Sequence, residues 1–322
     1  MYNIAIIGAG QLGSRHLQGL TLAKLPMRLF VVDNLVAALD LTRVRYEEMP
    51  CNKHIESITY LTSIESLPSE LDMVIVATGS KSRSHLLVDL LSKKEVKYLV
   101  LEKVLFPDLG SYETITVLLN RKGLGEKTWI NCPRRMFDGY KKLQTEFRGV
   151  KQIRYEKTGS DWGLGCNAIH FIDHYAFLSG DMAIQPFNLS GLDHRILESK
   201  RAGYVEFTGV ITGLTDSGNE IRLASLSKQN QPDILAITAD GIHYDINETT
   251  DQILKEGKLW APIGIKYQSS LTGEIAEQIL LQGTCELTRY AESTVLHLAF
   301  LRPLVAFYNS LTKQKGDSCP IT

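Results

Sequence analysis

A glycine-rich turn close to the N-terminus constrains the fold of this chain more than any other feature. Gly8, Gly10 and Gly13 form the stretch GAGQLG, which directly follows the β-branched run NIAIIG and opens a helical pattern. Glycines at these positions permit a tight turn and let the backbone approach a pyrophosphate, which the helix N-terminus then stabilises. The motif alone is a weak signal, but a strand before it and a helix after it supply the required context. It predicts a dinucleotide-binding site.

Further strand candidates alternate with helical patterns along the first third of the chain. They are RLFVVD (28–33), TYLTS (59–63), MVIVAT (73–78), YLVLEK (98–103) and TWINCP (128–133). Continuous apolar runs are typical of strands buried on both faces, and so indicate a parallel sheet covered by helices. We therefore predict a doubly wound α/β Rossmann domain over residues 1–127, with TWINCP closing its sheet at the boundary.

The residue at the end of the second strand candidate bears on whether the chain binds NAD or NADP. Asp33 stands there, 20 residues beyond Gly13. Its carboxylate can accept hydrogen bonds from ribose hydroxyls and repels a 2′-phosphate. The nearest arginines, Arg43 and Arg45, lie well into the next helical pattern. We predict NAD rather than NADP, against the alternative of a Rossmann-like domain that binds no dinucleotide.

Other residues expected beside the cofactor lie near the carboxyl ends of the strands, where ligands of such sheets bind. Besides the glycines and Asp33, the expected cofactor set comprises Gln11, Leu12, Thr78, Gly79, His85, Glu102 and Lys103. His85 is expected to pack beside the nucleotide loop rather than to act chemically.

From about residue 150 strand patterns follow one another without regular helices between them. The runs are VKQIRYEK, AIQPFNLSG, GYVEFTGVITG, NEIRLASLS, DILAITAD and GIHYDI. They predict an α+β domain over residues 128–322 with a large, mostly antiparallel, open-faced sheet. One long helical stretch is expected at roughly 273–310, followed by a frayed tail, KQKGDSCPIT. Because an uncovered sheet face must be polar or paired, we expect a homodimer or homotetramer formed through this sheet.

Composition excludes several classes of protein. The 322 residues are 44% apolar and 22% charged with a formal net charge of -1, which argues against a nucleic-acid partner. No apolar run approaches the roughly 20 residues of a membrane span, and the N-terminus lacks the features of a signal peptide. The five cysteines are widely spread without a CxxC pair, which disfavours disulfides and structural zinc. We expect a cytoplasmic protein.

The segment WGLGCNAIHFIDHYAFL (162–178) concentrates polar and small residues in an apolar context. It is consistent with a catalytic helix, a metal site or a packed helix. His170 and His174 are four residues apart, which is metal-ligand spacing, but no third ligand is evident. We therefore predict no metal.

Five motifs, taken together, resemble those of the Gfo/Idh/MocA oxidoreductases, the glucose–fructose oxidoreductase and inositol dehydrogenase group. The motifs are GAGQLGSRH, ATGSKSRSH, LEKV, INCPRRMF and GLGCNAIHFIDHYAFLSG, in the family's order over nearly the whole chain. Gly79 and Val104 replace two prolines that are usual in the family. The resemblance implies an NAD(P)-binding domain, an open-faced sheet domain and an active site in the cleft between them.

Two residues correspond by position to the family's catalytic set. Lys103 takes the place of the E-K-P lysine, and His170 takes the place of the helix histidine, whereas Cys166 replaces an aspartate. We expect His170 to act as acid or base and Lys103 to hold the reacting oxygen. The resemblance thus implies NAD-dependent hydride transfer at a hydroxyl or keto carbon of a sugar or sugar derivative. The alternative is a catalytically impaired dinucleotide-binding regulator of the same fold.

The remaining substrate candidates each have a second interpretation. Arg134 and Arg135 suit a phosphate or carboxylate clamp, which favours a phosphorylated, acidic or nucleotide-linked sugar, or else form surface ion pairs. Trp162 suits a wall against a sugar face, as does Tyr140, or either packs in the core. His174 is expected to pack against neighbouring residues or to cap, and a contact with the substrate is the alternative.

Two polar residues flank His170 on the same segment. For Asn167 we expect one of two roles: it orients His170 or the substrate, or it caps the helix N-terminus. Asp173 is expected to be structural and to bond the backbone or an arginine.

Overall fold

The structure, a computed structural model, describes residues 1–227 and 230–322 and contains two compact units. Unit 1 comprises Met1–Leu105, Ser111–Pro133 and Lys266–Ala291, and unit 2 comprises Phe106–Gly110, Arg134–Ile265 and Glu292–Thr322. The boundary drawn from the sequence at residue 127 falls inside the second segment of unit 1.

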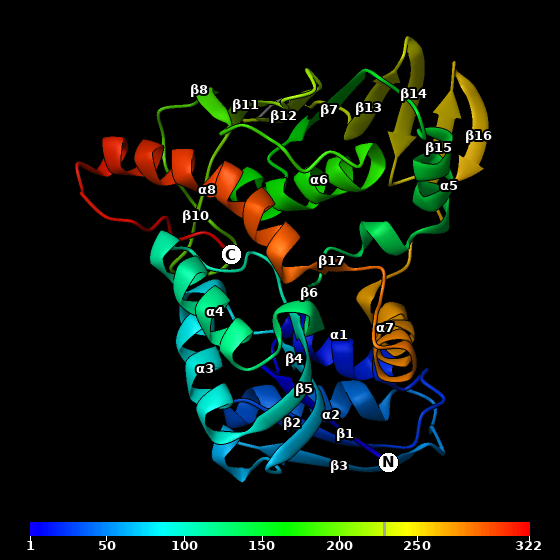
Figure 1. Cartoon of the computed structure of the whole chain (residues 1–322), viewed down its shortest axis with the longest axis vertical. Helices are drawn as coiled ribbons and strands as arrows, with labels where there is room; N and C mark the ends of the chain where they lie inside the picture. Colours follow the sequence, from blue (N-terminus) through cyan, green and yellow to red (C-terminus); the bar gives the residue numbers. More distant parts are fainter. Residues whose placement is uncertain (228–229) are drawn as a thin grey trace. The chain divides into compact units, whose positions relative to one another are not determined.

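Unit 1 is built on a seven-stranded sheet in the order β17-β6-β5-β4-β1-β2-β3 (Figure 1). The strands are β1 (Tyr2–Ile7), β2 (Met27–Val32), β3 (Ile55–Leu61), β4 (Glu70–Val76), β5 (Glu95–Leu101), β6 (Thr128–Ile130) and β17 (Thr288–Arg289). All neighbours pair in parallel except β17, which pairs antiparallel with β6. Their apolar runs are buried, with Ile4 and Val74 both 0% exposed. The predicted Rossmann sheet is confirmed.

Helices cover both faces of this sheet. They are α1 (Gln11–Leu20), α2 (Val36–Glu47), α3 (Ser80–Lys93), α4 (Leu109–Arg121) and α7 (Gln268–Gln282), with short 3₁₀ turns at Ile64–Ser66 and Gly125–Lys127. Since β1 lies between β2 and β4, the winding of the chain reverses between β1 and β4. Right-handed crossovers then place the earlier and later helices on opposite faces (Figure 1). This reversal is where sheets of this type bind ligands, at the carboxyl ends of the strands.

Unit 2 is built on an eight-stranded sheet in the order β16-β15-β14-β13-β7-β12-β11-β8. The strands are β7 (Ile153–Ser160), β8 (Asn188–Leu192), β11 (Gly209–Leu214), β12 (Glu220–Leu226), β13 (Ile234–Ala239), β14 (Ile242–Asn247), β15 (Gln252–Lys255) and β16 (Lys258–Pro262). Only the β7–β12 pair is parallel. In β7, buried Ile153, Tyr155 and Lys157 alternate with more exposed residues, so one face is covered. The predicted open-faced sheet is confirmed.

The other elements of unit 2 lie around that sheet. They are α5 (Asp138–Glu146), α6 (Leu164–Ser179), the 3₁₀ turn Pro133–Met136, and the two-stranded pair β9 (Leu197–Glu198) and β10 (Val205–Glu206). The closing helix is α8 (Tyr290–Thr312). Helix α6 packs against β7 and β12, on the side drawn below the strands in Figure 1.

Two sequence-based expectations for the C-terminal region are wrong. The single helix at 273–310 is two helices, because Gly283 takes a left-handed conformation (φ 73°) and ends α7 before β17. The tail is not frayed. Cys319 and Ile321 are 0% exposed, and the Val205 N–H donates to the Pro320 carbonyl at 2.8 Å. Apolar burial and backbone pairing therefore fix the last residues in unit 2.

Candidate functional site

The three glycines of the N-terminal loop meet three different surroundings. Gly8 has φ 100°, and a Cβ there would lie 2.9 Å from the carbonyl carbon of Ala77. A Cβ at Gly13 would lie 1.7 Å from the Gly8 carbonyl oxygen. A Cβ at Gly10 would meet nothing within 4 Å. The first glycine thus makes the turn, the third permits close helix packing, and the second leaves open space where a pyrophosphate fits.

The N-terminus of α1 offers its backbone donors to that space. Gly10 is its N-cap and supplies no side-chain hydrogen bond, and the first turn holds no acidic residue. The first N–H groups of a helix carry partial positive charge and suit a phosphate. Gln11 is exposed and Leu12 half-buried in this turn. The loop therefore fits a dinucleotide on sterics and on charge.

Asp33 stands beside the loop at the end of β2. Its Oδ2 accepts from the Ala9 N–H at 2.7 Å, and its Oδ1 accepts from the Leu35 N–H at 2.9 Å. An ionised carboxylate has about four acceptor sites, so both oxygens retain capacity for ribose hydroxyls. The two backbone contacts hold the half-buried carboxylate beside the glycine loop.

Arg45 lies closer to the loop than its sequence position indicated. Its guanidinium donates to Gln11 Oε1 at 2.9 Å and to Ser14 Oγ at 2.7 Å, both on α1. The sequence analysis missed this contact because it depends on how α2 packs against α1. Arg45 joins the residues around the first turn of α1.

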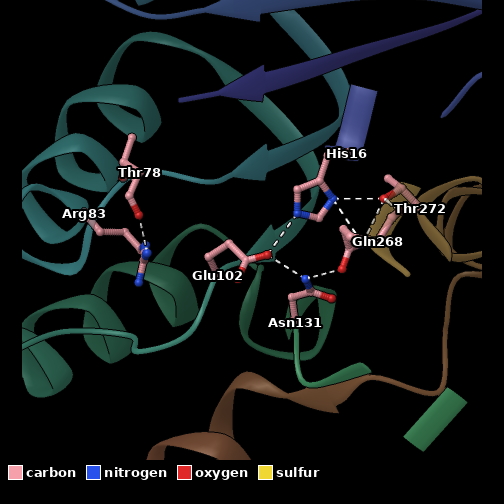
Figure 2. A network of polar contacts seen from close by, with 7 residues as sticks. All are labelled: His16, Thr78, Arg83, Glu102, Asn131, Gln268 and Thr272. Atoms are coloured by element: carbon pink, nitrogen blue, oxygen red, sulfur yellow. Dashed lines mark hydrogen bonds and ion pairs between the residues drawn. The ribbon is translucent and has the colours of Figure 1, made fainter. Parts of the chain in front are cut away.

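A buried polar network holds the end of β5 (Figure 2). Glu102 is 3% exposed, and its Oε1 accepts from His16 Nε2 at 2.9 Å and from Asn131 Nδ2 at 2.5 Å. His16 Nδ1 lies 3.0 Å from Thr272 Oγ1. Gln268 links the two sides, accepting from Asn131 and donating to Thr272. The network thus connects helices α1 and α7 with the ends of strands β5 and β6. Within it, His16 and Asn131 contact the Glu102 carboxylate directly.

Glu102 is charged within this network. Burial raises the pKa of its carboxyl group, but the hydrogen bonds from His16 and Asn131 and the charge of Lys103 outweigh burial and lower that pKa. A buried, fully hydrogen-bonded carboxylate fixes local geometry strongly. Because Glu102 directly precedes Lys103, the network fixes the backbone beside half-buried Lys103, which lies two residues beyond the end of β5.

Arg83 ties two neighbouring strand ends together and was not predicted. It is 1% exposed and donates to the backbone carbonyls of Val104, Leu105 and Thr78. Figure 2 shows its contact with Thr78. Gly79 is the N-cap of α3, whereas His85 lies on the same helix with an exposed side chain.

In unit 2, His170 lies half-buried on α6. Cys166 stands one turn earlier on the same helix, so the two share a face as expected. Asn167 is not the helix cap. Gly163 is, with φ 77°, and Asn167 Nδ2 instead donates to the Trp162 carbonyl at 2.8 Å.

Arg134 and Arg135 pair with carboxylates of the protein. Arg134 donates twice to Glu248, at 2.7 Å each, and Arg135 donates twice to Asp173, at 2.9 Å each. The Arg135–Asp173 pair is buried on both sides, with 11% and 1% of the side chains exposed, whereas in the other pair Arg134 is 15% and Glu248 34% exposed. The expected arginine partner of Asp173 is Arg135.

His174 is a packed, neutral residue. It is 0% exposed, and burial together with the charge of Arg134 lowers its pKa to about 3. Its Nδ1 lies 3.0 Å from the Tyr155 hydroxyl, and its ring centroid lies 4.0 Å from that of Tyr140. Tyr140, also 0% exposed, belongs to the core. Trp162 is half-buried and donates Nε1–H to the Ala224 carbonyl at 2.8 Å.

Two features are absent from the residues that the structure describes. No helix over residues 1–227 and 230–322 is long and apolar enough to cross a membrane. The same residues contain no group of three or more His, Cys, Asp or Glu side chains arranged to hold a metal ion.

Comparison with known proteins identifies the N-terminal region. Residues 2–125 match the model of the Gfo/Idh/MocA oxidoreductase family with an NAD-binding Rossmann fold, which confirms the predicted cofactor and the resemblance. No curated protein sequence matches the chain significantly.

Solved structures resemble the chain over nearly its full length. Scyllo-inositol dehydrogenase from Lactobacillus casei, with bound NAD(H) and scyllo-inositol, is 15% identical, with 97% of each chain covered and a TM-score of 0.66. UDP-N-acetylglucosamine 3-dehydrogenase from Acidithiobacillus ferrooxidans is 15% identical, with 92% of this chain and 95% of that chain covered and a TM-score of 0.66. An Agrobacterium radiobacter oxidoreductase in complex with NAD+, L-tartaric acid and magnesium is 13% identical, with 98% and 97% covered and a TM-score of 0.69. These likenesses show the same fold.

Proposed function

We propose a specific reaction for this chain, whose residues 2–125 match the model of the Gfo/Idh/MocA oxidoreductases with an NAD-binding Rossmann fold. It is an NAD-dependent dehydrogenase or reductase that acts on a hydroxyl or keto carbon of a sugar or sugar derivative. The glycine loop carries this proposal, because Gly10 alone of its three glycines leaves open space beside the donors of α1. The inositol and UDP-sugar dehydrogenases with the same fold support a sugar-type substrate.

The proposed chemistry uses one cation and one imidazole. NAD, when bound, supplies the hydride acceptor. His170 takes the hydroxyl proton on a ring nitrogen, since imidazole is the side chain best matched to proton transfer near neutral pH. The Lys103 ammonium donates to the same oxygen and stabilises the negative charge that develops there. In the reverse direction His170 returns the proton to the oxygen of the keto group.

Cys166 distinguishes this chain within the proposal. A thiol stands one helical turn before His170, and a neutral thiol does not favour the imidazolium as a carboxylate does. Cys166→Asp is therefore expected to raise the pKa of His170 and to move the acidic limb of the kcat/KM profile to higher pH. A profile identical to that of the wild type contradicts this role for position 166.

The test is turnover followed at 340 nm with NAD and a panel of sugars, sugar acids and nucleotide sugars, or with NADH and keto-sugars. Lys103→Met and His170→Asn are each expected to lower kcat at least about 10²-fold, and His170→Asn is expected to change NADH affinity less than threefold. Lys97→Met is the matched control and keeps full activity, since Lys97 is an exposed lysine on β5, the strand that ends two residues before Lys103. Tight NADH binding without turnover on any panel member refutes the dehydrogenase and favours the regulator.

A further inference from the structure

Unit 2 contains a cavity of about 350 Å³ beside the N-terminus of α6. Its lining includes Trp162, Cys166, Asn167, Ser199, Glu206 and Ser225. The volume lies within the range of sites for small molecules. All of these residues belong to unit 2, so the cavity is complete within one compact unit.

The lining of this cavity includes a hydroxyl group that lacks a partner. Ser225 lies on β12, and its register partners on the two neighbouring strands are Gly159 and Gly209, which have no side chains to fill the space. Ser225 is 0% exposed, and its Oγ has no hydrogen-bond partner within residues 1–227 and 230–322. A buried hydroxyl without a partner destabilises the folded protein, and because Ser225 lines the cavity, a bound ligand can supply the missing hydrogen bond.

A carboxylate from β10 occupies the N-terminus of α6. Glu206 accepts from the Gly165 N–H at 2.7 Å and from the Cys166 N–H at 3.1 Å. A Cβ at Gly165 would lie 3.0 Å from Glu206 Oε2, and one at Gly163 would lie 3.2 Å from Oε1. The two glycines therefore make room for this carboxylate. The helix N-terminus, which would otherwise attract an anionic ligand, already has its anion.

The charge of the cavity also disfavours an anionic ligand. The charged side chains that line it are Asp161, Glu198, Glu206 and Lys200. Three carboxylates against one ammonium repel a phosphate or a second carboxylate, whereas they accept hydrogen bonds from hydroxyl groups. The Trp162 ring offers a flat apolar surface of the kind that packs against the C–H face of a sugar ring.

We propose that this cavity binds the uncharged, hydroxyl-rich part of the substrate and rejects phosphorylated and carboxylated sugars. Glu206 and Ser225 are its specificity-determining residues: Glu206 accepts from substrate hydroxyls, and Ser225 exchanges a hydrogen bond with one of them. This inference rests on the proposed dehydrogenase function and narrows its substrate class, because neither Arg134 nor Arg135 lines the cavity.

Binding of matched sugars by saturation-transfer NMR to the full chain tests the proposal without requiring turnover. The pairs are glucose with glucose 6-phosphate and with glucuronate, and myo-inositol with its 1-phosphate. We expect at least one uncharged member to bind at least tenfold more tightly than its anionic counterpart. Glu206→Gln is expected to reduce that discrimination at least threefold, because it removes the negative charge.

Ser225→Ala separates a ligand-binding role from a structural one. It removes a buried hydroxyl without a protein partner, so we expect Tm to stay the same or rise while the affinity for the uncharged sugar falls at least fivefold. Thr294→Val is the matched control, since Thr294 Oγ1 is also buried, lacks a partner among the described residues and lies outside the cavity lining. It is expected to leave sugar affinity unchanged.

Three results overturn the proposal. They are equal or tighter binding of the anionic members, failure of every uncharged member to bind, and unchanged affinity in Ser225→Ala. Failure of this cavity proposal can be distinguished from failure of the dehydrogenase proposal. Ser225-dependent sugar binding without hydride transfer refutes only the dehydrogenase, whereas turnover of a phosphorylated sugar refutes only the selectivity of the cavity.

Discussion

Replacing Gly10 with alanine separates cofactor binding from folding. Its backbone (φ −69°, ψ −165°) is open to alanine, and a Cβ there meets no atom within 4 Å. Alanine is a poorer N-cap than glycine, which destabilises the helix. It also lowers the conformational entropy of the unfolded chain, which stabilises the folded protein by about 0.4–1 kcal/mol. These two effects nearly cancel, so we expect the free energy of unfolding to change by less than about 0.5 kcal/mol.

The same methyl group is expected to weaken cofactor binding strongly. It projects into the open space beside the first N–H groups of α1, where the pyrophosphate fits. A displaced phosphate loses charge-assisted hydrogen bonds, and loss of about 1.4 kcal/mol raises the Kd for NADH tenfold. We therefore expect at least a tenfold increase in Kd with a nearly unchanged urea midpoint.

Gly13→Ala is the matched variant in the same loop. Its Cβ would lie 1.7 Å from the Gly8 carbonyl oxygen, so the backbone must move. We expect destabilisation of about 1–3 kcal/mol or more. NADH fluorescence titration gives the affinities, and urea unfolding gives the stabilities. If Gly10→Ala binds NADH as the wild type does, or if Gly13→Ala is as stable as the wild type, this account of the loop is refuted.

Three further predictions concern the paired and packed groups of unit 2. Burial raises the pKa of Glu248, but the guanidinium of Arg134 outweighs it and lowers that pKa to about 2 from 4.5, so stability that is present above about pH 4.5 is lost as pH falls toward 2. The side chain is 34% exposed, so screening limits the effect to about 1–2 kcal/mol; a Glu248→Gln unfolding profile with the wild-type acid slope contradicts this. Arg135→Ala leaves the carboxylate of Asp173, 1% exposed, without its partner and is expected to cost about 3–5 kcal/mol in urea unfolding. The double variant Arg135→Ala with Asp173→Ala should cost less than the single one, and equal costs argue against a buried pair. Because the pKa of His174 falls to about 3, protonation favours unfolding, and stability declines as pH drops from about 6.5 toward 3. His174→Phe should flatten that decline in thermal melts while keeping activity, and a large loss of kcat would show that His174 takes part in the reaction.

The features that the sequence predicted well are those with local causes. Strands β1, β4 and β5 were predicted because a parallel sheet buries both faces and so requires continuous apolar runs. The loop was predicted because its glycine spacing, between a strand run and a helical pattern, is visible in a short stretch of sequence.

The features that the sequence did not reveal depend on distant contacts. The Glu206 carboxylate reaches Gly165 across 41 positions, so no local pattern links it to α6. The end of α7 is an exception, because Gly283 with its left-handed φ is a local signal for a helix C-terminus that the sequence analysis overlooked. The buried tail is too short for any periodicity, and its position depends on pairing with Val205.

Transfer of deuterium from NADH deuterated at C4 to a keto-sugar tests the central claim most directly. The protein is incubated with labelled NADH and the keto-sugar that turns over best, and the alcohol product is analysed by mass spectrometry. An NAD-dependent dehydrogenase gives a product one mass unit heavier, with the deuterium on the carbinol carbon. Tight NADH binding with no deuterium in any product contradicts the account and identifies the chain as a binding protein of this fold.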